Sequence, residues 1–331
     1  MAGAGFFAQY HADAWNRCPG VTITAIADPD QEKARAFAAR WGLERVYADP
    51  AEMLARERPD FLDIVTGPST HLELTRLGAA ARVAVISQKP MAPTWEDSLA
   101  MVECCEAAGV RLLVHENWRW QPWYRETKRI LESGALGRVF YLGFRMRNGD
   151  GRGPEPYRVQ PYFVQMKRFL IFETLVHFLD TFRFLGGELR ELYCRTARIN
   201  PVIAGEDAAL LRLGFQSGAE GVIDANRISG PVPNDATFGQ MRVEGDLGMV
   251  EMGGDGRLTV TRYGESPREH PYEIPAQGYR GDSILALHRH FAACLREGQR
   301  CESEGREYLR TVRAVFASYE SAETNQVIQL S

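Results

Sequence analysis

The sequence predicts a two-domain protein of mixed α/β and α+β class, in which a doubly wound parallel sheet is followed by a large, mainly antiparallel open sheet. Up to about residue 117, short apolar runs alternate with segments of helical periodicity, as in parallel crossover units. Beyond residue 118, strand-like runs are joined by short turns such as Gln216-Ser217-Gly218, which indicates antiparallel pairing. We therefore expect domains at 1–118 and 119–331.

The chain opens with a glycine-rich turn that is typical of dinucleotide binding. Residues 3–8 read G-x-G-x-x-A and lead into a helical stretch, after which the strand-like run 21–27 ends at Asp28. The glycines would let the backbone approach a pyrophosphate, while Asp28 would bind ribose hydroxyls and repel a 2′-phosphate. This arrangement predicts NAD as cofactor in preference to NADP.

The strand that should precede this turn is expected to be missing, because only Met1 and Ala2 stand before Gly3. A start site assigned too late, or a shortened chain, would explain it. Since that strand is central in a doubly wound sheet, its loss would leave two rows of backbone groups unsatisfied.

The later elements of the first domain alternate strictly between helix and strand. We expect helices at 31–41, 71–81 and 95–108, and strands at 61–66, 83–87 and 110–115. Ligands of such sheets bind at the carboxyl ends of the strands. Asp28, residues 66–68, Lys89 and Asn117 all fall at such ends, so one crevice could hold them.

The second domain is expected to be a sheet with few helices. Its predicted helices cover 123–133, the segment around Glu173, 283–297 and 304–324, and its predicted strands cover 139–147, 189–199, 208–215, 219–226, 239–244, 248–252 and 258–262. The Gly/Pro-rich loop 148–161 is predicted to be a lid or substrate arm.

Lys89, Glu173 and His177 are the candidate catalytic residues. Glu173 and His177 stand four residues apart in a segment with helical periodicity, which would place both on one face of a helix. Their neighbours are apolar, and ionisable groups in such a run are costly to bury unless they are paired or used. A lysine, a carboxylate and an imidazole are the set that a proton-coupled hydride transfer needs. An ordinary pair on a helix face is the alternative interpretation.

Composition excludes several classes of function. The chain has 331 residues, 45% hydrophobic content and a net charge of −4, with no dense basic run among aromatics, so nucleic acid is not an expected partner. No apolar run approaches the roughly 18 residues of a membrane span, which predicts a cytoplasmic protein. The six cysteines form no C-x-x-C pair and are expected to be reduced. His288-x-His290 and His115-Glu116 lack a third ligand nearby in the sequence, so no metal site is expected.

Five short motifs occur in order along the chain. They are the turn at 3–8, Thr66-Gly67-Pro68-Ser69-Thr70-His71, Gln88-Lys89-Pro90, Asn117-Trp118-Arg119-Trp120-Gln121-Pro122 and Glu173-x-x-x-His177-x-x-Asp180. Together they resemble the phosphate turn, T-P-x-x-x-H, E-K-P, N-R-R-F-x-P and D-x-G-x-H-x-x-D motifs of the Gfo/Idh/MocA oxidoreductases, which include glucose-fructose oxidoreductase and inositol dehydrogenase. The chain departs from these motifs at Gly67, Gln88, Glu173 and Leu175. The resemblance covers essentially the whole chain and implies a Rossmann-type first domain.

The resemblance also implies roles for individual residues. His177 would take the hydroxyl proton, Lys89 would stabilise the developing alkoxide and Glu173 would orient His177, unless Asp180 is the functional acid. The expected cofactor-binding residues are Gly3, Gly5, Phe6, Phe7, Asp28, Thr66, Pro68, His71, Gln88 and Asn117. The expected substrate-binding residues are Lys89, Trp118, Arg119, Trp120, Tyr162, Gln165 and His177, with Lys167 as a further hydroxyl contact.

The departures from the family motifs are themselves similar to a subgroup described as D-apiose or related aldose dehydrogenases. In that case Trp118, Trp120, Trp123 and Tyr124 would pack on sugar C–H faces, with plain core packing as the alternative. Family members usually pack open sheet faces together, so a homodimer or homotetramer through residues 238–252 is expected.

The function predicted from the sequence is hydride transfer between NAD and a hydroxyl carbon of a sugar, polyol or inositol. The alternatives are an NADPH-dependent carbonyl reductase and a catalytically silent nucleotide-binding regulatory protein. Asp28 disfavours the first alternative, and the presence of both Lys89 and His177 disfavours the second.

Overall fold

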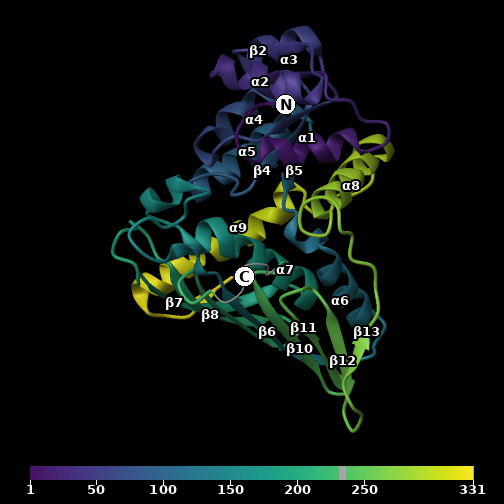
Figure 1. Ribbon diagram of the computed structural model, residues 1–331, viewed down its shortest axis with the longest axis vertical. Helices are drawn as coiled ribbons and strands as arrows, with labels where there is room; N and C mark the ends of the chain where they lie inside the picture. The colour runs from purple at the N-terminus through teal and green to yellow at the C-terminus, as the bar shows by residue number, and fades with distance from the viewer. Residues whose placement is uncertain (231–235, 331) are drawn as a thin grey trace. The chain divides into compact units, whose positions relative to one another are not determined.

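The computed structural model describes residues 1–230 and 236–330, and the chain divides by its contacts into two units, each described here by itself (Figure 1). The first unit comprises 1–120 and 276–312, and the second comprises 121–275 and the chain after 312. The division near residue 120 lies close to the predicted boundary, but 276–312 belongs to the first unit and not, as expected, to the second. The reason is apolar packing, because Leu287 and Phe291 are buried in one cluster with Trp15.

The first unit is a parallel sheet with helices, as the alternating pattern predicts. Its strands are β1 (Ala25–Ala27), β2 (Arg45–Tyr47), β3 (Phe61–Ile64), β4 (Ala84–Gln88) and β5 (Leu112–His115), and its helices are α1 (Ala8–Asn16), α2 (Gln31–Trp41), α3 (Pro50–Glu57), α4 (His71–Ala80), α5 (Trp95–Ala108) and α8 (Ser283–Glu297). β1 pairs with β2, and β3, β4 and β5 pair in that order, all parallel.

The position of the first strand is occupied by the first residues of the chain, which corrects the expectation that it is wholly missing. Ala2 forms parallel bridges to Ala27 of β1 and Ile64 of β3. Its N–H donates to Asp63 O at 2.8 Å, and its own carbonyl accepts from Val65 N–H at 2.8 Å. On the other side, Gly3 N–H donates to Ala27 O at 2.8 Å and Ala27 N–H donates to Met1 O at 2.9 Å, so backbone groups on both β1 and β3 are satisfied at this level of the sheet.

Helix ends in the first unit follow their capping residues. The Asp30 side chain accepts from Lys33 N–H at the start of α2, which ends at Gly42 with φ of 72°. Thr94 accepts from Asp97 N–H at the start of α5, which ends at Gly109 with φ of 68°. Polar N-caps and left-handed glycines of this kind fix helix boundaries.

The second unit is built on a nine-stranded sheet within the described residues, with the order β13-β12-β11-β10-β6-β9-β8-β7-β14. Its strands are β6 (Val139–Arg147), β7 (Leu189–Ala197), β8 (Ala208–Phe215), β9 (Glu220–Asn226), β10 (Gly239–Gly245), β11 (Gly248–Met252), β12 (Leu258–Arg262), β13 (Arg268–His270) and β14 (Ile328–Gln329). Only β6 and β9 pair in parallel among these strands, so the predicted mainly antiparallel sheet is confirmed.

Helices of the second unit lie against this sheet. They are α6 (Pro122–Glu132), α7 (Val176–Gly186) and the later part of α9 (Gly305–Thr324), within which the two units divide. α7 packs on β6 and beside α6 (Figure 1).

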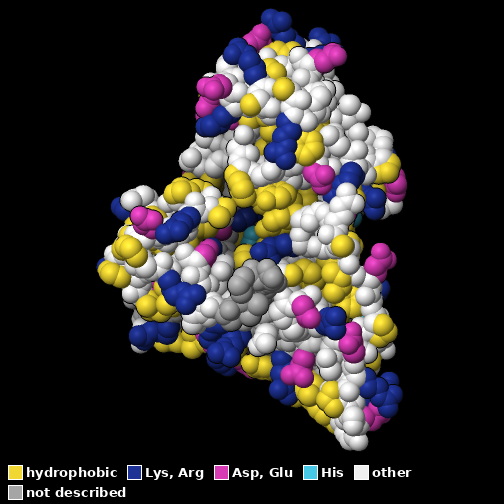
Figure 2. All heavy atoms as spheres, viewed as in Figure 1, with side chains coloured by type: hydrophobic (Ala, Val, Ile, Leu, Met, Phe, Trp, Pro, Cys, Tyr) yellow, Lys and Arg dark blue, Asp and Glu magenta, His cyan; other side chains and the backbone are white. Residues whose placement is uncertain are grey.

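Charged side chains of both signs are interspersed on the face shown in Figure 2. Across the described part of the chain, no helix combines the length and apolar character needed to cross a membrane.

Candidate active site

The glycine-rich turn connects the start of the chain to α1 and lies beside Asp28. Gly3 has φ of 99°, and a Cβ there would approach Val65 O to 2.6 Å, so only glycine fits. Ala4 N–H donates to Asp28 Oδ2 at 2.8 Å. A Cβ on Gly5 would meet nothing within 4 Å, which leaves open space over the turn. An open backbone cradle beside a carboxylate is what a nucleotide with free ribose hydroxyls requires.

His71 lies beneath the segment that follows β3. Its Nε2 is 3.1 Å from Thr66 O and its Nδ1 is 2.9 Å from Met91 O, and the ring is fully buried. Burial lowers the pKa of His71. Pro68 opens the short 3-10 turn η1 (Pro68–Thr70), and the hydroxyl of Thr70 lies 2.7 Å from that of Thr66, two residues before the turn. His71 therefore holds the Thr66 loop in place through its backbone.

The residues that follow β4 and β5 are positioned by polar contacts inside the first unit. Gln88 is the last residue of β4, and its Oε1 accepts from Lys89 N–H at 2.8 Å. Asn117 follows β5, is buried, and donates from Nδ2 to Ser283 Oγ at 2.9 Å. Phe6 is 51% exposed at the turn, whereas Phe7 packs on α1 and against Tyr279 with ring centroids 5.4 Å apart.

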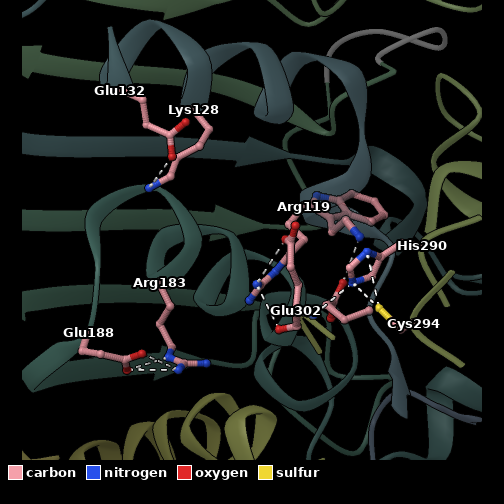
Figure 3. A network of polar contacts seen from close by, with 10 residues as sticks. Arg119, Lys128, Glu132, Arg183, Glu188, His290, Cys294 and Glu302 are labelled. Atoms are coloured by element: carbon pink, nitrogen blue, oxygen red, sulfur yellow. Dashed lines mark hydrogen bonds and ion pairs between the residues drawn. The ribbon is translucent and has the colours of Figure 1, made fainter. Parts of the chain in front are cut away.

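Three residues expected to bind substrate occupy the 3-10 turn η2 (Trp118–Trp120) of the first unit. Trp118 is 2% exposed. Figure 3 shows Arg119 directed toward Glu302. Its Nη1 donates to Glu302 O at 3.5 Å. The Trp120 ring lies 4.7 Å from the ring of His290. His290 of α8 and Glu302 after α8 thus contact Trp120 and Arg119, which could not be foreseen from their sequence neighbours.

Trp123 and Tyr124, which the sequence offered as sugar-packing surfaces or as core, are core residues. Both are fully buried in the second unit at the start of α6.

Glu173 and His177 do not share a uniform α-helix. Glu173 lies in a π-helical turn (Leu170–Leu175), and His177 lies in the first turn of α7, 6% exposed. π-helical turns inside helices are frequent at functional sites because they alter the direction of nearby side chains. Asp180 lies fully buried in α7, and Thr181 Oγ1 donates to His177 O at 2.8 Å.

The start of the π-helical turn is anchored by Glu206, a residue that sequence reasoning missed. Its carboxylate accepts from Phe169 N–H at 3.2 Å, Ile171 N–H at 3.0 Å and the Tyr319 hydroxyl at 2.6 Å. Tyr319 also accepts from Phe172 N–H at 3.1 Å. The first N–H groups of a helix need such acceptors, and here buried side chains distant in sequence supply them.

Arg227 organises the loop predicted to be a lid, and sequence reasoning missed it as well. Its guanidinium pairs with Asp150, donates to Thr174 Oγ1 at 3.0 Å and lies about 5.1 Å from the ring centroids of Tyr157 and Phe163. Cation–π contacts of a buried arginine hold a loop firmly. A cavity of about 300 Å³ is lined by residues of this loop. No spacing in the sequence links Arg227 to residue 150.

Tyr162 and Gln165 belong to the 3-10 turn η4 (Pro161–Gln165) at the end of that loop. Desolvation of the hydroxyl and, next, the charge of Glu173 raise the pKa of Tyr162, although its side chain is 56% exposed. Gln165 and Lys167 are exposed.

Three histidines meet in the interior of the first unit, where His115 and His288, which stand in two separate pairs in the sequence, lie together with His11. Ring nitrogens of His11, His115 and His288 lie within 4.8 Å of one another. His11 comes from α1, about a hundred residues before His115, so no local spacing in the sequence announces it. All six cysteines, each among the described residues, are free thiols.

Comparisons with known proteins agree with this geometry. Residues 1–116 match the NAD-binding Rossmann domain of the Gfo/Idh/MocA oxidoreductases, and residues 124–251 match a C-terminal domain of the same group. D-apiose dehydrogenase of Paraburkholderia graminis is 37% identical over 100% of this chain and 88% of the relative. The chain belongs to the Gfo/Idh/MocA oxidoreductase family.

Two further proteins are similar to this chain over nearly all of their lengths. D-apiose dehydrogenase of Rhizobium rhizogenes is 34% identical over 100% of this chain and 96% of its own. An oxidoreductase from Agrobacterium radiobacter, solved with NAD+, L-tartaric acid and magnesium, superposes with a TM-score of 0.93 at 33% identity, covering 99% of this chain and 97% of that one. The predicted family, fold, NAD cofactor and oxidoreductase activity are therefore confirmed.

Proposed function

We propose that this family member is an NAD-dependent dehydrogenase of D-apiose or a related aldose. The observation that carries the proposal is that two relatives named D-apiose dehydrogenase align over the whole chain, at 37% and 34% identity. The Asp28 carboxylate beside the glycine turn supports NAD over NADP, since it would repel a 2′-phosphate. A reducing, cytoplasmic location and a homo-oligomer through 238–252 belong to the same proposal.

The residues proposed to hold NAD fit its chemistry. The open turn at Gly5 suits the pyrophosphate, with Phe6 and Phe7 flanking it, and Asp28 suits the ribose. Thr66, Pro68, His71, Gln88 and Asn117 complete the proposed set, with His71 acting through the backbone of Thr66 and Gln88 through the backbone of Lys89. When bound, NAD+ supplies the hydride acceptor.

The proposed catalytic residues divide the proton chemistry among them. His177 takes the proton of the substrate hydroxyl, and an imidazole suits this task near neutral pH. Lys89 donates a hydrogen bond to the same oxygen and stabilises the negative charge that develops there. Glu173, or Asp180 in its place, orients His177. Trp118, Arg119, Trp120, Tyr162 and Gln165 are the proposed sugar contacts.

Replacement of Lys89 by Met tests this proposal. With NAD+ and D-apiose, and with a panel of aldoses and inositols, K89M should lose at least about a hundredfold in kcat, because it removes a charge-stabilising donor. Its affinity for NADH, followed by tryptophan quenching, should be unchanged. An unaltered kcat would overturn the catalytic assignment, and turnover of inositols but not aldoses by the wild type would overturn the substrate. Tighter binding of NADPH than NADH would favour the carbonyl reductase alternative.

A further inference from the structure

Gln88 joins the backbone of Lys89 to two buried imidazoles. Its Oε1 accepts from Lys89 N–H at 2.8 Å. Its Nε2 lies 2.8 Å from His11 Nε2 and 3.2 Å from His115 Nδ1. Gln88 is 5% exposed and both histidines are fully buried, so water does not compete for these contacts.

The contacts continue beyond both imidazoles. His11 Nδ1 lies 2.8 Å from Asp63 Oδ2, which also accepts from Trp15 Nε1 at 2.7 Å. His115 Nε2 lies 3.0 Å from His288 Nε2. The His288 ring stacks on Trp15 with centroids 3.6 Å apart, and the rings of His11 and His115 stack at 4.0 Å. The result is one hydrogen-bonded chain from Asp63 to His288 with Gln88 at its centre.

The direction of every bond in this chain follows from Lys89. Its N–H needs an acceptor, so the amide oxygen of Gln88 must face it and the NH2 group must face the two imidazoles. His11 Nε2 and His115 Nδ1 are then acceptors. His11 carries its hydrogen on Nδ1 and donates to Asp63, and His115 carries its hydrogen on Nε2 and donates to His288.

A glutamine at position 88 is therefore matched to its neighbours. A carboxylate there would face His11 Nε2 and His115 Nδ1 with acceptors only, so at least one further proton would have to be bound. A buried imidazolium or a buried carboxylic acid would result, each disfavoured by desolvation. The lone pairs that a metal ion would need on His11 and His115 are directed at the Gln88 amide.

We propose that Gln88 is a positioning residue for Lys89, and that His11 and His115 require an amide at this position instead of the carboxylate of the E-K-P motif. Through this chain the interior of the first unit fixes the backbone from which the Lys89 side chain starts. The inference deepens the proposed function and rests on the catalytic role given there to Lys89.

Proton uptake on folding distinguishes this proposal from a simple packing role. Q88E should bind one more proton than the wild type when folded, on an imidazole or on the new carboxyl group. A proton that is held more tightly in the folded state stabilises the folded protein at low pH, and this stabilisation is lost as pH rises. The unfolding constant of Q88E relative to wild type should thus rise up to about tenfold per pH unit between about pH 6 and about pH 9.

The charged and titratable groups that face the chain must be held constant in this comparison. They are the Asp63 carboxylate on β3, the terminal ammonium of Met1 near Asp63, His11 on α1, His115 and the neighbouring Glu116 after β5, and His288 on α8. Asp63, Met1, Glu116 and His288 do not contact position 88 and are present in both proteins, so their contribution cancels in the ratio to first order, whereas His11 and His115 contact position 88 and can take up the additional proton.

Two further variants serve as controls. Q88M removes both the donors and the acceptor without adding an ionisable group, so its instability should be independent of pH. Q216E makes the same chemical change at an exposed turn between β8 and β9 and should match the wild type. If the ratio of the unfolding constants of Q88E and the wild type is constant with pH, or falls as pH rises, the proposed requirement for an amide at position 88 is overturned. If Q88E does not fold at neutral pH, its recovery at about pH 6 tests the same prediction.

Kinetics test the positioning of Lys89. Under conditions where both are folded, Q88E and Q88M should lower kcat by about tenfold or more with a smaller change in KM for NAD+, because a displaced Lys89 is felt mainly in the transition state. Wild-type kcat in both variants would overturn the positioning role. If K89M itself retains activity, the proposed function fails, whatever the proton uptake of Q88E shows.

Discussion

The hydroxyl of Tyr319 donates a hydrogen bond of 2.6 Å to Glu206 at the start of the π-helical turn that carries Glu173. Burial and then the Glu206 charge raise the pKa of Tyr319, so the hydroxyl keeps its proton and remains a donor. The same carboxylate accepts from Phe169 and Ile171 N–H groups. A helix that bears two proposed catalytic groups therefore begins on one buried carboxylate.

Replacing Glu206 by alanine should destabilise the protein and weaken catalysis together. Three donors would lose their acceptor in a site that is 8% exposed, which corresponds to a loss of about 3 kcal/mol or more in the free energy of unfolding. Urea unfolding measures this loss. Because a small displacement of Glu173 and His177 is enough to misalign them with the substrate, kcat should fall by about a hundredfold.

Tyr319→Phe is the matched control, since it removes one donor and leaves Glu206 bonded to the backbone. It should cost about 1 kcal/mol and have a much smaller effect on kcat. An E206A protein with normal kcat would show that the π-helical turn keeps its geometry without the carboxylate.

Gly3 and Gly5 should respond differently to the same substitution. G3A places a Cβ 2.6 Å from Val65 O at φ of 99°, so it should lower the free energy of unfolding by about 2 kcal/mol or more. The Cβ of G5A meets no atom within 4 Å outside its own residue and its chain neighbours, so G5A should unfold like the wild type within about 0.5 kcal/mol.

The affinity of G5A for NADH tests the position proposed for the pyrophosphate. The Cβ of G5A would occupy space proposed for the pyrophosphate, so its affinity should fall by about tenfold or more despite normal stability. Normal NADH affinity in G5A would place the pyrophosphate elsewhere.

The sequence predicts most of the fold because the signals that set it are local. Alternation of apolar runs with helical stretches predicts the parallel sheet. The glycine turn and Asp28 predict the edge of that sheet at which a dinucleotide binds. The sequence does not predict the role of Ala2, because a strand of five or six residues is usual at this position and here one residue bridges both β1 and β3.

Long-range partners account for what the sequence does not predict. Glu206, Arg227 and His11 act on residues far from them in the chain, and each would pass as an ordinary polar residue in its own segment. The π-helical turn also depends on a distant residue, because its first N–H groups are held by Glu206. The four-residue spacing of Glu173 and His177 indicates a helix and does not distinguish an α-helix from a π-helical turn. Residues 276–312 join the first unit through burial of α8 against Trp15, which amphipathic periodicity does not specify.

Stability should fall in mild acid because of two buried imidazoles. Burial lowers the pKa of His71, and burial followed by the nearby His115 and His11 lowers that of His288 well below its usual value. Below about pH 6.5 the unfolded chain binds protons at both sites, whereas the folded chain binds them only at lower pH, so the free energy of unfolding decreases as pH falls between the two. Each site contributes up to about 1.4 kcal/mol per pH unit in that range.

Chemical unfolding between about pH 5 and about pH 8 measures this dependence. His71→Gln removes one of the two sites and should give a shallower pH dependence below about pH 6.5, even though loss of the contacts to Thr66 and Met91 lowers stability at every pH. The shape of the curve separates titration from lost contacts, because only the protonation term changes with pH. A slope in H71Q equal to that of the wild type would mean that His71 binds its proton equally well in the folded and unfolded chains.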